Sequence, residues 1–501
     1  MSNKKWVMLP MLALLVLGLW PQSRSNAAGE QLFVETGWRV GGHVLEFWQR
    51  SGGLAVFGLP LGPEQRERTG DGTYALQRFE RARVELHPEK RAPYNVELGR
   101  VGADLLARQQ RNWSSEIDEQ LLTGQCRSFP ETGRQVCGPF LDYWLSHGLD
   151  LGDEGVSYRE SLALFGLPLT GTRMETNSSG DRVITQWFER ARFEYHPKNP
   201  QPYTVLLGRL GAELSGEPPP LPQPAIAILP QTSILQGHTL TVEVKSSEAT
   251  GVSGMLGSTA LAFTRRDGSW LAIGAVHGLQ QPGPLQVRVE AALADGRTAT
   301  GRATIQVIDA GYPVEYINLP PDVRDSIANN REALEAENAR VRAIWPVVTP
   351  QRLWNGRFIM PTEGVLVSSY GGRRSYNGGP VSSFHEGIDI ANAVGTPIIA
   401  PAAGNVVLAG TGFIARGGAV ILDHGWGIHT GYWHMEEVLV SEGQFVEQGQ
   451  VIGLMGARGM VTGPHLHWEL RIGPHSADPL EWINREWPPS QPGSRGKAMP
   501  R

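Results

Sequence analysis

Cysteine is almost absent from this chain, because only Cys126 and Cys137 occur among its 501 residues. Two thiols at this spacing match no standard metal-binding pattern, so a cysteine-based metal site is excluded. They can still close a short local loop if the chain reaches an oxidising compartment. We therefore expect a disulfide between them.

A surplus of positive charge is missing as well. The formal net charge is −5, from 45 basic and 50 acidic residues. Proteins that bind nucleic acids usually carry a basic surplus, so the composition predicts no nucleic-acid partner. Hydrophobic residues make up 41% of the chain and charged residues 19%, which argues against a disordered or fibrous protein.

The longest apolar run lies near the N-terminus and is short. It extends from Trp6 to Trp20, is interrupted by Pro10, and follows two lysines. A membrane-spanning helix needs about 20 apolar residues, whereas small residues at 25–27 offer a cleavage site. The pattern is typical of a secretory signal peptide, which we predict over 1–28. We expect a secreted or cell-envelope protein without stable membrane insertion after cleavage; a membrane anchor is the alternative.

An internal duplication follows. Three motifs recur in the same order: Leu-Ala-x-Phe-Gly-Leu-Pro-Leu at 54–61 and 162–169, Phe-Glu-Arg-Ala-Arg at 79–83 and 188–192, and Leu-Gly-Arg-x-Gly at 98–102 and 207–211. This shared order predicts two related units, at 29–110 and 126–214. The offset between them grows along the chain, which predicts an insertion in the second unit near 148–161.

Each unit is expected to be α+β. Residues 141–147 have the pattern of a short amphipathic helix, and 74–86 and 183–195 alternate like strands. The Phe-Gly-Leu-Pro segment resembles the repeats rich in Leu, Gly, Phe and Pro of cell-wall-associated bacterial proteins. That resemblance implies binding to the wall; a structural spacer is the alternative.

The middle of the chain changes character three times. Residues 215–224 contain five prolines and predict a stiff linker. Residues 225–309 alternate in short runs separated by Asp-Gly turns, which predicts an immunoglobulin-like β-sandwich. Prolines precede and follow residues 322–345, which predicts a helix there. Its apolar residues repeat every seven positions, which favours packing on a neighbouring domain.

Histidine is concentrated in the C-terminal third. Seven of the 13 histidines lie between His385 and His475, far more than an even spread would place there. Neutral imidazole is the commonest zinc ligand in proteins, so this excess suggests a metal site.

Three histidine motifs stand in this region. His385 and Asp389 are four residues apart on a segment expected to enter a strand. His465 and His467 flank one residue of an expected strand, so both imidazoles should point to the same face. His434 ends a Tyr-Trp-His stretch.

Together these motifs resemble the lysostaphin-type (LytM-like) zinc endopeptidases. Segments similar to other motifs of that family lie at 369–373, 395–404 and 446–453. The resemblance implies a mostly antiparallel β domain with a groove, which we place at 355–485. The whole chain is therefore expected to be a multidomain, β-rich protein: α+β tandem repeats, a central β-sandwich and this domain.

The resemblance also implies residue roles. His385, Asp389 and His467 would hold one Zn2+, and His434 and His465 would be the catalytic pair. Three protein ligands leave the fourth tetrahedral position open, as a catalytic zinc site requires.

The function implied is that of a secreted zinc metalloendopeptidase, with peptidoglycan as its partner. It would hydrolyse peptide bonds in stem peptides or cross-bridges by means of a zinc-activated water. The alternative is a catalytically inactive or regulatory cell-wall-binding protein that activates another hydrolase. The oligomeric state has no signature in the sequence.

Two further expectations concern the surroundings of the site. The helix at 322–345 and the segment up to Phe358 could cover the groove until they are displaced. His424 and His429 are expected to be structural, and His475 is expected to lie in a solvated loop.

Overall fold

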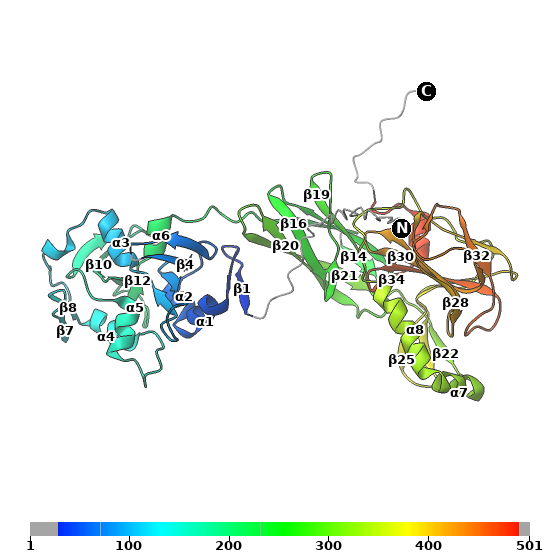
Figure 1. Cartoon of the computed structure of the whole chain (residues 1–501), viewed down its shortest axis with the longest axis horizontal. Helices are drawn as coiled ribbons and strands as arrows, with labels where there is room; N and C mark the ends of the chain where they lie inside the picture. The colour runs from blue at the N-terminus through cyan, green and yellow to red at the C-terminus, as the bar shows by residue number, and fades with distance from the viewer. Residues whose placement is uncertain (1–28, 71, 231, 490–501) are drawn as a thin grey trace, which may run out of the picture.

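The computed structural model describes residues 29–70, 72–230 and 232–489. The signal peptide expected at 1–28 lies outside the described residues. Among those that are described, no helix is both long and apolar enough to cross a membrane. The repeat units, the sandwich and a third β-rich body follow one another in a row (Figure 1).

The two repeat units have the same order of elements. The first comprises β1 (Glu30–Phe33), β2 (Trp38–Gly41), α1 (Gly42–Arg50), α2 (Gly53–Phe57), β3 (Gln65–Arg68), β4 (Thr73–Arg78), β5 (Arg83–Leu86), β6 (Val96–Leu98) and α3 (Val101–Arg108). After a 3-10 turn at Trp113–Ser115, the second comprises β7 (Cys126–Phe129), β8 (Arg134–Cys137), α4 (Pro139–Ser146), α5 (Tyr158–Phe165), β9 (Arg173–Thr176), β10 (Arg182–Trp187), β11 (Arg192–Tyr195), β12 (Val205–Leu207) and α6 (Leu210–Ser215). The α+β class expected for the repeats is confirmed.

The differences between the units are local. Only Ser51 and Gly52 separate α1 from α2, whereas 147–157 separate α4 from α5. The insertion therefore lies in the region expected from the sequence. The expected disulfide joins Cys126 to Cys137 across the β7–β8 hairpin.

The repeated motifs bind each other across the two units. The N–H groups of Gly102 and Ala103, at the start of α3, donate to Glu189 O at 3.0 Å each. In the reciprocal contact, the Ala212 N–H in α6 donates to Glu80 O at 3.0 Å. The Leu-Gly-Arg-x-Gly end of each unit thus caps the Phe-Glu-Arg-Ala-Arg turn of the other.

Charged side chains follow the same reciprocal pattern. Arg100 pairs with Glu189 at 2.9 Å, and Arg209 pairs with Glu80 at 2.6 Å. A contact in which the same surface patch serves both partners is isologous, as in a two-fold symmetric dimer. The two units therefore form a pseudo-dimer within one chain.

The central body has two facing sheets. One has the order β13-β15-β19-β18 and the other β14-β21-β20-β16-β17. Their strands are β13 (Ala225–Leu229), β14 (Ser233–Leu235), β15 (Thr239–Lys245), β16 (Ala249–Leu256), β17 (Thr259–Leu261), β18 (Thr264–Arg266), β19 (Ser269–Ala275), β20 (Gly283–Leu293) and β21 (Thr298–Ile308). Buried residues such as Leu240, Val287 and Ile305 fill the space between the sheets, as expected of a β-sandwich.

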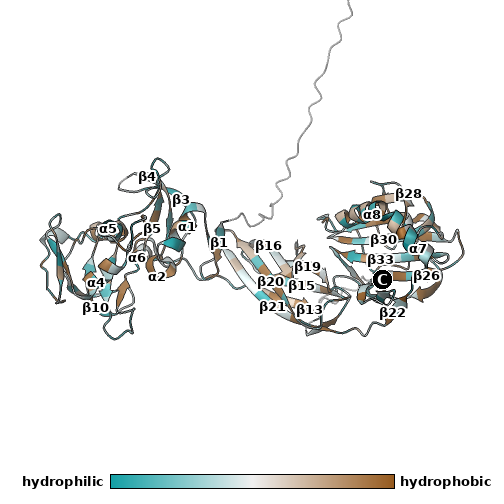
Figure 2. Ribbon diagram, turned by 90° about the horizontal axis from the view of Figure 1, so that it is seen from below, coloured by the Kyte–Doolittle hydropathy of each residue, from teal (hydrophilic) through white to brown (hydrophobic). Residues whose placement is uncertain are grey.

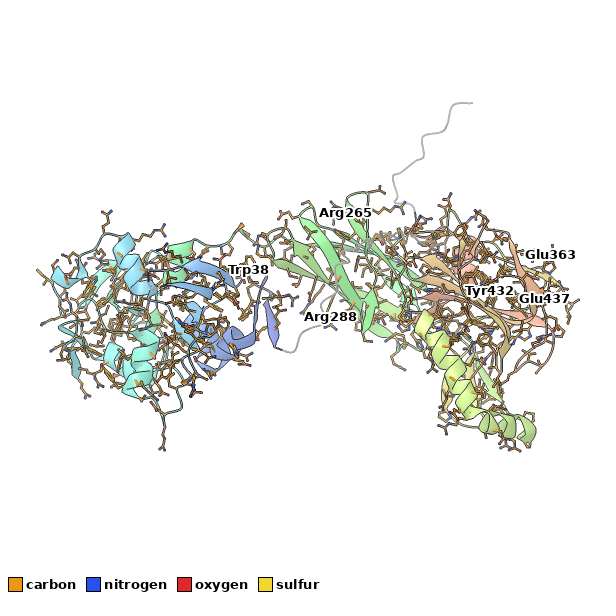
Figure 3. The ribbon with its side chains drawn as sticks, in the orientation of Figure 1. Trp38, Arg265, Arg288, Glu363, Tyr432 and Glu437 are labelled. Atoms are coloured by element: carbon orange, nitrogen blue, oxygen red, sulfur yellow. A yellow bond between two sulfur atoms is a disulfide. The ribbon has the colours of Figure 1, made fainter. Side chains whose placement is uncertain are left out.

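The repeat units touch this sandwich through the β1–β2 hairpin. Arg39 pairs with Glu290 at 2.8 Å, and the Thr298 N–H donates to Gly37 O at 2.9 Å. Trp38, labelled in Figure 3, lies at this junction. The proline-rich segment is fixed beside it, because Arg297 Nη1 donates to Pro219 O at 2.6 Å.

The third body is built on a ten-stranded sheet whose main path runs β23-β26-β33-β30-β29-β28-β31. The pairings within this ten-stranded sheet are antiparallel, as expected. A separate three-stranded sheet has the order β22-β24-β25, with β22 parallel to β24. The elements are β22 (Val314–Ile317), α7 (Pro321–Asn329), α8 (Arg331–Ile344), β23 (Val365–Ser368), β24 (Arg373–Tyr376), β25 (Val381–Phe384), β26 (Gly387–Ala391), β27 (Pro397–Ile399), β28 (Gly404–Phe413), β29 (Gly417–Gly425), β30 (Ile428–Val438), β31 (Phe445–Val446), β32 (Val451–Met455), β33 (His465–Ile472), β34 (His475–Ala477) and α9 (Pro479–Asn484).

The expectation of a single helix at 322–345 is wrong. The structure has two helices, α7 and α8, which are separated at Asn330. Asn329 and Asn330 are adjacent, and asparagine side chains compete with the helical hydrogen bonds of the backbone. Figure 2 shows α7 and α8 beside the strands of the third body.

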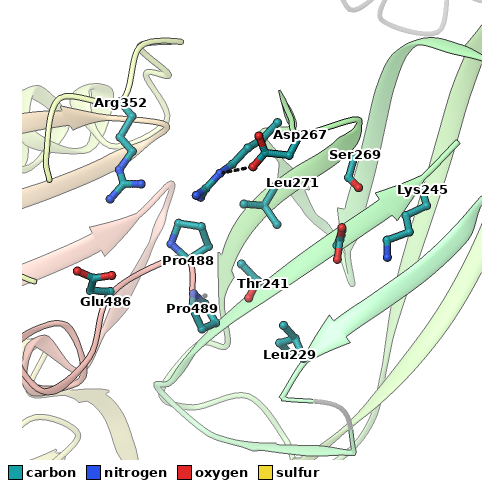
Figure 4. Close-up of a pocket in the computed structure, with 12 residues that line it drawn as sticks. Leu229, Thr241, Lys245, Asp267, Ser269, Leu271, Arg352, Glu486, Pro488 and Pro489 are labelled. Atoms are coloured by element: carbon teal, nitrogen blue, oxygen red, sulfur yellow. Dashed lines mark ion pairs between the residues drawn. The ribbon is translucent and has the colours of Figure 1, made fainter. Parts of the chain in front are cut away.

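The sandwich is docked firmly on the third body. Glu481 of α9 accepts hydrogen bonds from the Thr239 N–H and from His238 Nδ1, both at 2.8 Å. Trp482 Nε1 donates to Thr239 Oγ1 at 3.1 Å. A cavity of about 380 Å3 opens at the edge of this junction, between Lys245 and Asp267 of the sandwich and the segment after α9 (Figure 4).

The interface between the repeats predicts the effect of Gly211→Ala. A Cβ at this position would lie 1.9 Å from Phe79 O, a backbone atom of the other unit. Helix propensity alone would favour alanine by about 1 kcal/mol, but overpacking against backbone costs about 1–3 kcal/mol. We expect a lower calorimetric melting temperature for the repeat units. Gly62→Ala, where no atom lies within 4 Å, is the control; a Gly211→Ala chain as stable as wild type would contradict the interface.

The sandwich junction predicts a pH dependence. Burial lowers the pKa of His238, but the hydrogen bond and charge of Glu481 outweigh it and raise this pKa above the usual value. A histidine whose pKa is raised by folding contributes its full stabilisation of the folded state below about pH 6.5. That contribution is lost as the pH rises through the raised pKa. We expect His238→Asn to lower the melting temperature by about 2–4 °C at pH 6 and by less at pH 9. A difference that grows with pH would contradict the sign.

Candidate metal centre

Strand β33 places alternate side chains on opposite faces of the sheet. Leu466 and Trp468 are buried in the core, so His465 and His467 point to the other face. In the sheet register, His467 lies opposite Asp389 of β26 on one side and Trp433 of β30 on the other. The strand pairing thus brings together residues that are 78 positions apart.

Three of the residues expected at the site converge closely. The distances between His385 Nε2, Asp389 Oδ1 and His467 Nδ1 are 2.8, 3.0 and 3.1 Å. Zinc with bonds of about 2.0–2.1 Å to nitrogen and oxygen separates tetrahedral ligands by about 3.3 Å. This is the one group of potential metal ligands found within the described part of the chain.

The outer nitrogens of these two histidines are already bound. His385 Nδ1 donates to Ser369 O at 2.8 Å, and His467 Nε2 donates to Glu469 Oε1 at 3.2 Å. A proton on the outer nitrogen alone leaves a lone pair on the inner one. Burial lowers the pKa of His467, but its hydrogen bonds with Asp389 and Glu469 raise it to about 9, so a metal ion would displace a proton from its inner nitrogen. Metal-binding histidines have this arrangement, because an acceptor behind the ring fixes its tautomer and orientation.

His434 and His465 are oriented in the same way. His434 Nδ1 donates to Arg458 O and His465 Nδ1 donates to Gly463 O, each at 2.9 Å. Their ring centroids are 4.9 Å apart, and His465 Nε2 lies 3.8 Å from Asp389 Oδ1. All five residues expected at the site therefore border one space.

The protonation states follow from burial and contacts. Burial raises the pKa of Asp389, but its hydrogen bonds with His385 and His467 outweigh this effect and hold the pKa well below the usual range. Burial lowers the pKa of His434 to about 4. Asp389 is thus an anion and His434 a neutral imidazole near pH 7.

Glu469 is a site residue that the sequence analysis missed. Its carboxylate accepts from His467, from Trp433 Nε1 at 3.1 Å and from Arg471 Nε at 3.0 Å. Arg471 also donates a hydrogen bond to Glu386 Oε2 at 2.6 Å. The signal was available, because Glu469 follows His467 by two residues on a strand and shares its face.

The remaining histidines of this region lie elsewhere. His424 and His429 are buried, and His424 Nδ1 donates to Ala403 O at 2.8 Å. The expectation of a solvated loop for His475 is wrong. It begins β34, is half-buried, and hydrogen-bonds Thr259 Oγ1 of the sandwich at 2.7 Å. Contact with a separate domain gives no signal in the local sequence.

Comparisons with known proteins match this part of the chain. Residues 383–479 match the model of Peptidase family M23. The peptidoglycan DD-endopeptidase ShyA of Vibrio cholerae is 44% identical over 88 residues, covering 18% of this chain and 20% of the relative. The murein hydrolase activator NlpD of Escherichia coli is 35% identical over 135 residues, covering 27% and 32%.

Among solved structures, the catalytic domain of lysostaphin from Staphylococcus simulans is similar with a TM-score of 0.20 and 26% identity, over 26% of this chain and 92% of that one. The chain spans between 19% and 41% of the length of eight curated relatives that it matches. The family-model match lies within the body that contains the converging histidines. The chain carries a peptidase M23 domain of the LytM-like type at residues 383–479.

Proposed function

We propose that this chain is a zinc metalloendopeptidase of the cell envelope that hydrolyses peptide bonds in peptidoglycan stem peptides or cross-bridges. The observation that carries the proposal is the convergence of four imidazoles and one carboxylate on a single space. Each imidazole has its outer nitrogen bound to a backbone carbonyl or a carboxylate, so its inner nitrogen faces that space. A relative named as a peptidoglycan DD-endopeptidase supports the substrate class.

The proposed zinc ligands are His385, Asp389 and His467. Two neutral imidazoles and a carboxylate form a ligand set that suits zinc, and three ligands leave one position open. When bound, zinc would supply Lewis-acid chemistry, polarising the scissile carbonyl and increasing the acidity of a water molecule.

His434 and His465 are proposed to handle protons beside the ligands. The low pKa of His434 keeps its Nε2 free to accept a proton from the attacking water near neutral pH. His465 Nε2 faces the same space, so one imidazole can take this proton while the other hydrogen-bonds the developing oxyanion or protonates the leaving amine.

The envelope location is part of the proposal. A disulfide joins the two cysteines of the chain, and such bonds persist in oxidising compartments. The expected signal peptide at 1–28 supports the same location, as do relatives named for peptidoglycan and murein.

A regulatory protein that activates another hydrolase is the second candidate. A relative named as a murein hydrolase activator favours it, with 35% identity over 135 residues. A binding module needs neither the three ligands nor the two further histidines. Cleavage by the purified chain separates the two functions.

The first test is digestion of purified peptidoglycan by the zinc-loaded mature chain, followed by mass spectrometry. We expect new peptide ends, because the residues required for water activation and proton transfer are in place. His434→Ala and His465→Ala should each lower the rate about 10²- to 10⁴-fold, while exposed His43→Ala should not. Intact peptidoglycan of several types after treatment with zinc-loaded wild type would favour the activator.

The second test concerns zinc affinity. Burial raises the pKa of Glu469, but the Arg471 charge and the His467 contact outweigh it, so Glu469 is an anion behind the ligand. Glu469→Gln should weaken zinc binding about 10- to 100-fold in a chelator competition assay. The control is Glu386→Gln, which touches Arg471 but not His467; equal affinities in both variants would refute this function of Glu469.

A further inference from the structure

Helix α8 covers the same face of the sheet that carries the histidines. The register aligns Leu408 with Ile421, Ile421 with Gly431, and Gly431 with Glu469, so these residues share one face. Val341 of α8 is buried in one cluster with Leu408 and Ile421.

Trp345, directly after α8, belongs to the same cluster and lies 5.2 Å from the Arg471 guanidinium. The helix covers the sheet beside the site, whereas the side chains of Asp389, His465 and His467 stay 16%, 17% and 13% exposed. The covering of the groove by this helix and the segment up to Phe358 stays a prediction.

The contact centres on a buried carboxylate in α8. Glu337 has a side chain that is only 5% exposed. It accepts hydrogen bonds from the consecutive N–H groups of Ile414, Ala415 and Arg416 at 2.6, 3.2 and 3.3 Å, and from Arg416 Nη1 at 2.8 Å. A buried charge is costly unless it is paired and hydrogen-bonded, so this arrangement fixes the 414–416 loop to the helix.

The fixed loop holds His434. The His434 N–H donates to Arg416 O at 2.8 Å. The Met460 N–H donates to Ala415 O at 3.0 Å, which joins the 414–416 loop to the loop that contains Arg458. Arg458 O is in turn the acceptor for His434 Nδ1.

The backbone of His434 needs such support. Its φ of 68° lies in the left-handed region, which residues other than glycine rarely adopt. A strained conformation of this kind persists only where surrounding contacts hold it. Both carbonyls that bind His434 come from the two loops that Glu337 anchors directly or through Ala415.

We propose that Glu337 is a positioning residue for His434, and that α8 is therefore an integral part of the site. The proposal rests on the proposed function, because His434 acts on substrate only if the chain is a peptidase. Glu337 touches no substrate; it fixes the two loops that set the place and direction of the imidazole.

The test uses the full mature chain loaded with zinc. Glu337→Gln keeps one acceptor oxygen but loses the charge, so the loop should loosen without unfolding. A misplacement of about 1 Å can cost on the order of 100-fold in rate. We expect kcat to fall about 10- to 100-fold, with KM and zinc affinity within about twofold. Glu335→Gln, on the exposed side of the same helix, should change nothing.

A double-mutant cycle separates positioning from a general structural effect. If Glu337 acts through His434, the Glu337→Gln/His434→Ala chain should be no slower than His434→Ala alone. Rate losses that multiply would overturn the proposal, as would an unchanged kcat in Glu337→Gln.

A second measurement does not depend on peptidoglycan cleavage. NMR of histidine-labelled, zinc-loaded chain should show a displaced His434 imidazole signal in Glu337→Gln and not in Glu335→Gln. If wild type fails to cleave peptidoglycan, the proposed enzymatic function fails, and this signal alone decides whether Glu337 positions His434. An unshifted signal would refute the positioning.

Discussion

The alternation of side chains along β33 is the constraint on which the site depends. This strand lies inside the sheet and is paired with β26 on one edge and β30 on the other. Its register is therefore fixed on both edges. Leu466, Trp468 and Leu470 fill the core on one face. A register slip of one residue would bury the imidazoles of His465 and His467 and remove that core packing. Folding energy and ligand placement are therefore set by the same pairing.

On the face of the sheet that carries the histidines, three carboxylates hold the side chains and loops of the site in place. Asp389 and Glu469 hydrogen-bond His467 directly, whereas Glu337 binds the loop that holds His434, and each carboxylate accepts two or more hydrogen bonds. Removing one partner from a buried charge is much more costly than removing an exposed one. The histidines are thus held by groups that tolerate little movement.

The sequence predicted the site where its signals are local. His465 and His467 are separated by one residue of an expected strand, so strand geometry alone placed both imidazoles on one face. His385, Asp389 and His434 were joined to them only by the resemblance to the lysostaphin-type endopeptidases. The β-rich fold class was equally accessible, because alternation and Asp-Gly turns report directly on strands. Glu469 could have been found by extending the same alternation one step further.

Features that depend on distant contacts could not be predicted. Glu337 binds a loop 77–79 residues away, and nothing in the helix distinguishes it from its exposed neighbour Glu335. His475 is half-buried only because Thr259 of another domain lies against it. α7 and α8 are separated at Asn330, the N-cap residue of α8. The prolines at the two ends of the segment indicated where the helical region begins and ends, but not this internal break.

The reciprocal contact between the repeat units has a consequence for their origin. Each unit carries both halves of the contact: a motif turn that accepts hydrogen bonds and a helix start that donates them. A single ancestral unit with these two motifs would have been self-complementary, able to pair with a second copy around a two-fold axis. Joining two copies in one polypeptide makes that pairing intramolecular, so that it no longer depends on protein concentration. Once linked, the two halves were free to diverge, and the segment at 147–157 is present in only one of them.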